Sequence, residues 1–503
     1  MATRNNDLFA AIDLGSNSFH MLVVRQIGHS VQTMAKVKRK VRLAAGLDDS
    51  LNLSKEAMER GWQCLRLFAQ RLQYLPPENV KIVATATLRL ANNVDQFVTQ
   101  AEQILGRRIN IISGEQEAAL IYQGAAYTSA GQPHRLIIDI GGASTEMIIG
   151  HDFDIHQAVS LNMGCVRFTT QFFNAGRFSA TAFELATEAA KHEAQALVTS
   201  YQQFGWQQCL GSSGTVQAIQ EVLLSQELDD QITLSRMHHL RDQIISCERL
   251  EQLNIKGLAE DRKPVFAGGL AILIGLFETF GITGMSISGG ALREGLIYGM
   301  INQPIEPGVR QSTLSALIHK YHIEPRHAEQ CRATALALFA HYKNQWPIEC
   351  HEGEELLGCV ALLHELGLTV GFADSHKHAE YILNVTQQPG FSKIQQALLA
   401  TLLGNSKGEI DSQSIESLRG YKAEQAFGLL RILRWSILLT SHRSSSLILP
   451  SEILTDGVDT HWNMPAGWRS SHPLTAADLL EEQAIQAKVG WKFNVSSLKT
   501  PSH

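Results

Sequence analysis

Two stretches of the chain share one plan: an apolar run, an aspartate, a turn of small residues and a second apolar run. They are "AAIDLGSNSFHMLVV" at residues 10–24 and "LIIDIGGASTEMIIG" at residues 136–150, with Asp13 and Asp139 at equivalent places. A lone turn of this kind is usually just a connection between two strands. Two copies, 126 residues apart, predict two similar subdomains that face each other across a cleft.

The two turns have the composition of a phosphate site. Small residues let backbone N–H groups converge on an anion, and hydroxyl groups add further donors. The residues predicted to bind phosphate here are Asp13, Gly15, Ser16, Asn17, Ser18, Gly141, Gly142, Ala143, Ser144 and Thr145. Asp13, Asp139 and Glu146 are predicted metal ligands, because Mg²⁺ prefers carboxylate, phosphate and water oxygens. The alternative is that these carboxylates only cap local turns.

Glu117 is the candidate catalytic residue. It lies in "SGEQEAALIYQGAAY" (113–127), where Ser113 and Gln116 have the spacing of a capping box and predict the start of a helix. An acidic residue in a first helical turn commonly just complements the helix dipole, which suits Glu115. If Glu117 instead points into the cleft, it could deprotonate a water that attacks phosphorus.

Cations near these motifs would attract a polyanion. In "AKVKRKVRLAAGL" (35–47) the period-two pattern places Lys36, Lys38, Lys40 and Arg42 on one strand face. An equally good explanation is that the lysines protect an exposed edge strand. Arg89 in "TATLRLA" is a further phosphate-binding candidate, with a surface helix position as the alternative.

Two later glycine turns also follow strand-like runs. They are "CLGSSGTVQAIQEV" (209–222) and "MSISGGALREGLIYG" (285–299). Each predicts a strand, a small-residue loop and a helix start, which places a phosphate near a helix N-terminus. Gly211, Ser213 and Gly214 are therefore added to the predicted phosphate site.

The surrounding pattern predicts the architecture. The first 300 residues alternate strand-like and helix-like segments, which indicates an α/β fold. "INQPIEPGVRQS" (301–312) is a candidate linker. Helical segments follow, and from about residue 449 a small α+β unit is expected. The predicted domains are 1–128, 129–303, 304–448 and 449–503.

Composition narrows the class of protein. The net charge of −6 argues against a dedicated nucleic-acid binder. The seven cysteines include no CxxC pair, so free thiols in a reducing compartment are expected. No uninterrupted run approaches about 18 apolar residues, and the N-terminus has no adequate signal-peptide core. We therefore expect a cytoplasmic protein that is not inserted in a membrane.

Taken in order, the motifs resemble the exopolyphosphatase/guanosine pentaphosphate phosphohydrolase (Ppx/GppA) family, within the sugar kinase–actin–heat-shock chaperone superfamily. The residues that carry the resemblance are "IDLGSNSFHMLV", "TATLR", "SGEQEAALIYQG", "IDIGGASTE", "GSSGTVQA" and "SGGALREGL". The resemblance implies two actin-like (ribonuclease H-like) subdomains around a cleft, then an all-α HD-like domain and a small α+β C-terminal domain. "KRKVRLAAGL" and "FAGGLAILIGLF" look closer to the guanosine pentaphosphate branch.

The resemblance also assigns roles. Glu117 matches the family's catalytic glutamate, Asp139 and Glu146 match its magnesium-associated acids, and Asp13 matches its first phosphate loop. One departure is "EQEAA", where the family often has E-E-A-R. Gln116 and Ala119 therefore replace a carboxylate and an arginine, and any charge pair they made is in doubt.

"LLHELGL", which contains His364 and Glu365, resembles the family's HD-phosphohydrolase-like helical domain. A working HD metal site needs His-Asp in tandem, whereas this chain has His-Glu. Further histidines and an acid nearby in sequence are His341, His376, His378 and Asp374. A structural role for this domain is favoured, with an independent metal site as the alternative.

The expected activity is Mg²⁺-dependent hydrolysis of the terminal phosphate of guanosine pentaphosphate (pppGpp), giving ppGpp and phosphate. The nearest alternative is exopolyphosphatase activity on inorganic polyphosphate. Two other classes are an ATP-dependent kinase of the same superfamily and a non-catalytic alarmone-binding protein. A homodimer is expected from the resemblance only.

Overall fold

The computed structural model describes residues 7–27, 30–48, 50–129, 133–226, 231–301, 309–348, 350, 352–386, 388–443 and 449–497. The chain divides into two compact units, Met1–Val309 and Arg310–His503. Most of the predicted linker, residues 302–308, lies outside the described residues. The finer division into four domains stays a prediction.

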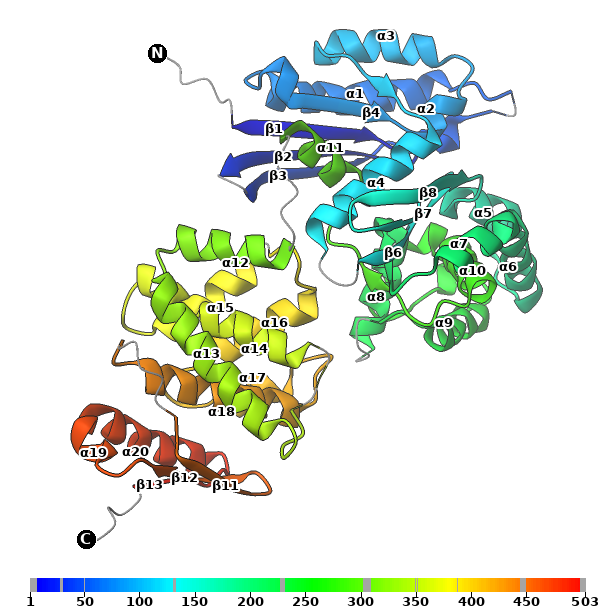
Figure 1. The fold of residues 1–503 in the computed structure, drawn as a ribbon. Helices are drawn as coiled ribbons and strands as arrows, with labels where there is room; N and C mark the ends of the chain where they lie inside the picture. Colours follow the sequence, from blue (N-terminus) through cyan, green and yellow to red (C-terminus); the bar gives the residue numbers. More distant parts are fainter. Residues whose placement is uncertain are drawn as a thin grey trace. The chain divides into compact units, whose positions relative to one another are not determined.

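The first unit contains two five-stranded sheets with the same topology (Figure 1). In each, the first three strands are antiparallel neighbours and the first strand also pairs in parallel with the fourth. The sheet of the first lobe has the order β3-β2-β1-β4-β5 and consists of β1 Leu8–Leu14, β2 Ser18–Ile27, β3 Ser30–Lys40, β4 Val80–Ala84 and β5 Asn110–Ile111. The sheet of the second lobe has the order β10-β9-β6-β7-β8 and consists of β6 His134–Ile140, β7 Thr145–His151, β8 Asp154–Leu161, β9 Gln208–Ser212 and β10 Ser286–Ile287. The structure thus confirms the repeat inferred from the two aspartate motifs.

Helices pack against each of the two sheets. Ser54 caps the first helix of the chain by accepting from Ala57 N–H, and the helices of the first lobe are α1 Lys55–Leu72, α2 Ala86–Leu90 and α3 Val94–Leu105. Those of the second lobe are α5 Cys165–Phe172, α6 Ala180–Ala194, α7 Val198–Phe204, α8 Ser213–Ser225, α9 Leu234–Ser246 and α10 Lys263–Phe280. Each set shares a core cluster with one sheet, which follows from the alternation of strand and helix patterns.

One helix has the length and mean hydropathy of a membrane span. It is α10, and it is the one such helix among the described residues. Its longest uninterrupted apolar run is shorter than the 18 residues considered above, and 72% of the helix is buried inside the protein. Its residues form a large part of the core of the second lobe, so its apolar composition is explained by burial against the sheet.

Two helices, α4 (Gly114–Thr128) and α11 (Leu292–Ile301), share a core with both sheets. This core joins β1 and β2 of the first lobe to β6, β7 and β9 of the second. The predicted capping box is present, because the Ser113 side chain accepts from Gln116 N–H and the Gln116 side chain accepts from Ser113 N–H. The helices cross at two glycines: a Cβ on Gly124 would lie 1.9 Å from Ala291 O, and one on Gly295 would lie 1.9 Å from Leu120 O.

The second unit is helical and ends in a small α+β part, as predicted. Its helices are α12 Val309–Lys320, α13 Pro325–Tyr342, α14 Gly353–Leu362, α15 Ser375–Val385, α16 Lys393–Gly404, α17 Ser412–Glu416 and α18 Ala423–Thr440. The last part has β11 Glu452–Asp456, β12 Asp459–Met464, α19 Trp468–Ser471, α20 Pro473–Lys488 and β13 Phe493–Ser497. Trp435 of α18 shares one core with Trp462 and Phe493 of the small sheet. A buried ion pair, Arg434–Glu482 at 2.7 Å, joins the same two parts.

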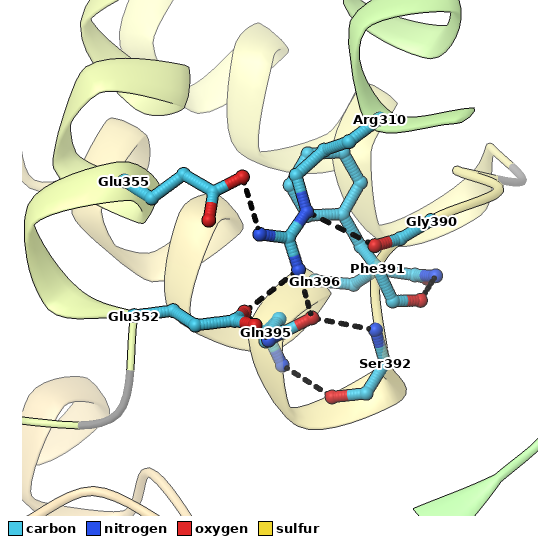
Figure 2. A network of polar contacts seen from close by, with 8 residues as sticks. All are labelled: Arg310, Glu352, Glu355, Gly390, Phe391, Ser392, Gln395 and Gln396. Carbon is cyan, nitrogen blue, oxygen red and sulfur yellow. Dashed lines mark hydrogen bonds and ion pairs between the residues drawn. The ribbon is translucent and has the colours of Figure 1, made fainter. Parts of the chain in front are cut away.

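Arg310 ties the start of the second unit to two other helices (Figure 2). Its guanidinium lies 2.7 Å from Glu352 and 2.7 Å from Glu355, donates to Gly390 O, and lies over the Phe391 ring. The side chain is buried, so the two carboxylates, the carbonyl and the aromatic face together replace its hydration shell. This network holds α12 against the N-terminal ends of α14 and α16.

The glycine crossing of α4 and α11 can be tested by adding a methyl group. Gly124→Ala would place a Cβ against the Ala291 carbonyl, which is backbone and cannot turn aside. We expect a loss of about 1–3 kcal/mol of stability, measured as a lower thermal midpoint. Gly299→Ala on α11 is the matched control, since a Cβ there meets nothing within 4 Å. A Gly124→Ala protein as stable as the Gly299→Ala protein would contradict the proposed close contact.

Candidate active site

The two aspartate turns open onto one cavity of about 470 Å³ within the first unit. The turns also contact each other, because a Cβ on Gly142 would lie 3.3 Å from Ser16 Cβ. The predicted site residues that line the cavity are Asp13, Gly15, Ser16, Asn17, Ser18, Lys36, Lys38, Glu117, Asp139, Gly141, Gly142, Ala143, Ser144, Glu146, Ser213 and Gly214. The cleft expected from the repeat is therefore present.

Strand register aligns the polar residues of each lobe into a row. In the first lobe Asp13 of β1 lies opposite His20 of β2, which lies opposite Lys38 of β3. In the second lobe the corresponding row is Asp139 of β6, Glu146 of β7 and Ser160 of β8. His20 thus occupies the place that Glu146 has in the second copy.

The contacts along the two rows differ in kind. His20 Nδ1 lies 3.4 Å from Asp13 Oδ2, so this ring nitrogen can share a hydrogen bond with the Asp13 carboxylate. In the second row, Ser160 donates to Glu146 Oε1 at 2.8 Å. The row of the first lobe therefore ends in a cation, Lys38, whereas the middle residue of the row in the second lobe is an acid, Glu146.

Glu117 is brought to these rows by the start of α4. Gly114, the first residue of that helix, packs so closely on β8 that a Cβ there would lie 2.4 Å from Ser160 Cβ. Three residues later, Glu117 is buried against the cavity with 8% of its surface exposed. Arg89 Nη1 lies 3.3 Å from Glu117 Oε2 and also donates to Ile112 O, so the arginine orients this carboxylate.

Burial and mutual repulsion shift the acids of the cavity strongly. The pKa of Glu117 is raised well above its ordinary value, first by burial and then by the charges of Glu146 and Asp13. Burial raises the pKa of Asp139 to about 6, against a hydrogen bond from Ser212. Burial and Asp139 raise the pKa of Glu146 to about 7. Carboxylates crowded in this way favour protons, cations or ligands that neutralise them.

The predicted cationic strand is only partly directed at the cavity. Lys36 and Lys38 line it, and burial followed by the nearby Arg262 lowers the pKa of Lys38. Lys40 instead pairs with Asp261 at 3.1 Å, joining the first lobe to the second. Arg42 lies beyond the end of β3 with a positive φ of 54°, which ends the alternation, and it is not part of the cavity wall. β3 is also an edge strand, so the alternative explanation for its lysines applies as well.

Three other predicted phosphate residues lie away from the cavity wall. Thr145 is fully buried and donates to Met163 O, because its place in β7 directs the hydroxyl into the second lobe. Gly211 lies in β9, where a Cβ would meet Val216 at 2.4 Å, so it serves packing. Arg89 is outside the wall and reaches the site only through Glu117.

Several cavity residues were not predicted. His20 could have been found from the repeat, because it follows Asp13 by the interval that separates Glu146 from Asp139. Arg293 lies within the quoted "SGGALREGL" motif, whereas Arg262 lies in no motif. The Arg262 guanidinium rests on the α8 loop so closely that a Cβ on Gly214 would lie 1.9 Å from its Nη2. Ser212 and Thr215 complete that loop.

Known proteins share both the sequence and the fold. A model of the Ppx/GppA phosphatase family matches residues 22–303, and a model of Ppx/GppA phosphatase domain III matches residues 309–483. A guanosine-5'-triphosphate,3'-diphosphate pyrophosphatase from Aeromonas hydrophila is 45% identical, covering 97% of this chain and 98% of its own. The protein of the same name from Vibrio parahaemolyticus is 44% identical, covering 98% and 99%.

Solved structures agree on the fold. The Aquifex aeolicus PPX-GPPA enzyme has a TM-score of 0.51 at 22% identity, covering 58% of this chain and 99% of its own. An exopolyphosphatase from Cytophaga hutchinsonii has a TM-score of 0.53 at 22% identity, covering 59% and 98%. These structures support the expected actin-like α/β fold for the part of the chain that they cover. The model of domain III matches the helical part, and the small C-terminal sheet is seen in the structure itself. The chain belongs to the Ppx/GppA phosphatase family.

Proposed function

We propose that this protein hydrolyses the terminal 5'-phosphate of pppGpp to give ppGpp and phosphate. The observation that carries the proposal is Glu117, a buried carboxylate in the one cavity onto which both aspartate turns open. The pyrophosphatase name of the relatives at 44–45% identity over nearly the whole chain supports pppGpp as the substrate.

The proposed reaction assigns each group a task. Backbone N–H groups of the two turns bind the phosphate oxygens, and Lys38 with Arg262 neutralises charge at the cavity wall. Glu117, held by Arg89, takes a proton from a water whose oxygen attacks the terminal phosphorus. The bond from that phosphorus to the bridging oxygen breaks, and the oxygen leaves on ppGpp. The raised pKa of Glu117 makes it a stronger base than an exposed glutamate.

We also propose Mg²⁺ as the cofactor, held by Asp13, Asp139 and Glu146. The donors fit a hard cation, since all three side chains are carboxylates that line the same cavity. Asp13 Oδ1 is buried without a hydrogen-bond partner, and burial raises the pKa values of Asp139 and Glu146, a shift that a bound cation would oppose. When bound, Mg²⁺ supplies charge neutralisation for the phosphate oxygens.

Inorganic polyphosphate is the second candidate substrate. Lys36 and Lys38 lie two residues apart on β3 and both line the cavity, which suits a polyanion longer than a nucleotide triphosphate. The decisive comparison is kcat/KM for pppGpp and for long-chain polyphosphate in one preparation. We expect the higher value for pppGpp; a higher value for polyphosphate would replace the first proposal by the second. Transfer of phosphate to a sugar, or binding without phosphate release, would contradict both.

A homodimer in the cytoplasm is proposed from the family resemblance. All seven cysteines are free, which suits a reducing compartment. A monomeric mass by light scattering at micromolar concentration would contradict the dimer.

Replacement of the base should separate binding from turnover. Glu117→Gln keeps the size of the side chain but cannot accept a proton, so we expect kcat for pppGpp to fall roughly 10²–10⁴-fold with little change in substrate Kd. Glu115→Gln is the matched control, because Glu115 is the exposed acid of the same helical turn. Wild-type kcat in Glu117→Gln would disprove the assigned role.

Removal of a cavity cation should weaken binding rather than chemistry. Lys38→Ala is expected to raise KM for pppGpp roughly tenfold, equivalent to about 1.4 kcal/mol, and to reduce the dependence of KM on salt. Arg39→Ala is the control, because Arg39 is the neighbouring cation but lies outside the cavity wall, toward Cys64. Equal changes in the two variants would indicate a general charge effect.

Mg²⁺ should stabilise the protein by relieving carboxylate repulsion. We expect the thermal midpoint to rise with Mg²⁺. At a Mg²⁺ concentration of 100 times Kd, the free energy of unfolding should increase by up to about 2.7 kcal/mol. Asp139→Asn should raise the midpoint of the metal-free protein, because it removes one buried charge, and should abolish the Mg²⁺ response. An unchanged Mg²⁺ response in Asp139→Asn would mean that the cation binds elsewhere.

A further inference from the structure

A second group of potential metal ligands lies in the helical part of the second unit. His327 of α13 lies beside His364 and Glu365, which directly follow α14 and Leu363. One candidate ligand atom from each residue lies within 4.8 Å of the others, and the two imidazole centroids are 5.0 Å apart. His327, which completes the group, was not among the residues suggested by sequence proximity to His364.

A hydrogen bond fixes the tautomer of the His364 imidazole so that its free nitrogen can bind a metal. His364 Nδ1 lies 2.8 Å from Ala361 O, and a carbonyl can only accept, so Nδ1 carries the proton. The lone pair is consequently on Nε2. A backbone carbonyl that fixes the tautomer in this way is a regular feature around metal-bound histidines. His327 Nε2 faces the acid, 3.7 Å from Glu365 Oε1.

Two of the three groups, His327 and Glu365, are buried, and His364 is half-buried. His327 and Glu365 are at most 9% exposed.

The ligand atoms of the three residues would have to move only slightly closer together to bind a zinc ion. With Zn–N distances of about 2.0–2.1 Å, two ligands of a tetrahedral zinc lie about 3.3 Å apart. The 3.7 Å and 4.8 Å limits observed here exceed that value by no more than about 1.5 Å, which side-chain rotation can supply. Two nitrogens and one carboxylate oxygen form a donor set that suits zinc better than magnesium.

A guanidinium currently balances the carboxylate. Arg443 pairs with Glu365 and, at 2.6 Å, with Glu324. Its side chain is 47% exposed and follows α18, so it can leave Glu365 without unpacking the core. Arg443 is therefore a competitor for the same carboxylate rather than a part of the packed interior.

We propose that His327, His364 and Glu365 bind one zinc-class divalent cation, with Arg443 as the cation that is displaced from Glu365. The site would join α13 to the end of α14, and its function would be separate from the phosphate cavity of the first unit. It does not depend on the proposed hydrolase activity.

Zinc binding to the full chain tests the site. Equilibrium dialysis with Zn²⁺ followed by elemental analysis should give one more zinc ion per chain for wild type than for His364→Gln. His376→Gln is the matched control and should retain the wild-type stoichiometry, because this histidine is outside the group. Co²⁺ should report the same difference as loss of its visible absorption bands in His364→Gln.

Two further variants separate the site from folding defects and from the cavity. Glu365→Gln should reproduce the loss of zinc if His364→Gln does not fold, as judged by circular dichroism. Arg443→Gln should increase zinc affinity, since it removes the cation that competes for Glu365. Zinc lost in Glu146→Gln but retained in His364→Gln would place the ion in the phosphate cavity and overturn the proposal. Unchanged zinc affinity in Arg443→Gln would overturn the competition.

Discussion

The first unit is organised around one electrostatic difficulty: four of the five acids that line its cavity belong to the two aspartate rows and the start of α4. These four are Asp13, Asp139, Glu146 and Glu117, and among the described residues Glu117 forms an ion pair with Arg89. Such crowding is stable only because rigid elements on both sides hold the acids in place. The two sheets supply three of them through one repeated register, and α4 adds the fourth. The cavity is consequently suited to a ligand that is itself rich in phosphate oxygens and accompanied by cations.

Local patterns predicted the parts of this arrangement that depend on short segments. The repeat around Asp13 and Asp139 predicted two sheets of one topology, and Ser113 with Gln116 predicted the helix that carries Glu117. Contacts between distant segments could not be predicted in the same way. Arg262 reaches the α8 loop only because α10 packs across the second lobe, and no motif surrounds it. The prediction for Arg42 was wrong for a different reason. The alternating sequence pattern continues to this residue, but its positive φ ends the extended backbone there.

In the second unit, the helical segments and the small α+β part share one hydrophobic core. The change from helices to short strands near residue 449 suggested a separate domain, and a distinct α+β part is present. Yet Trp435 packs against Trp462, and Arg434 binds Glu482 in the interior, so the small sheet shares the core of the helices. Composition along the chain detects the change of secondary structure but not the sharing of a core, because the latter depends on pairs of residues far apart in sequence.

The packing of α11 has a consequence for biosynthesis. Phe9 and Ala11 of β1 share a core with Leu292 and Leu296 of α11, although almost the whole first unit separates them in sequence. A ribosome that adds roughly 5–20 residues per second needs roughly 15–60 s to travel from one to the other. During that interval the inner face of the first sheet lacks its last covering helix. A nascent first lobe therefore exposes an apolar surface that a chaperone could occupy until α11 leaves the ribosome.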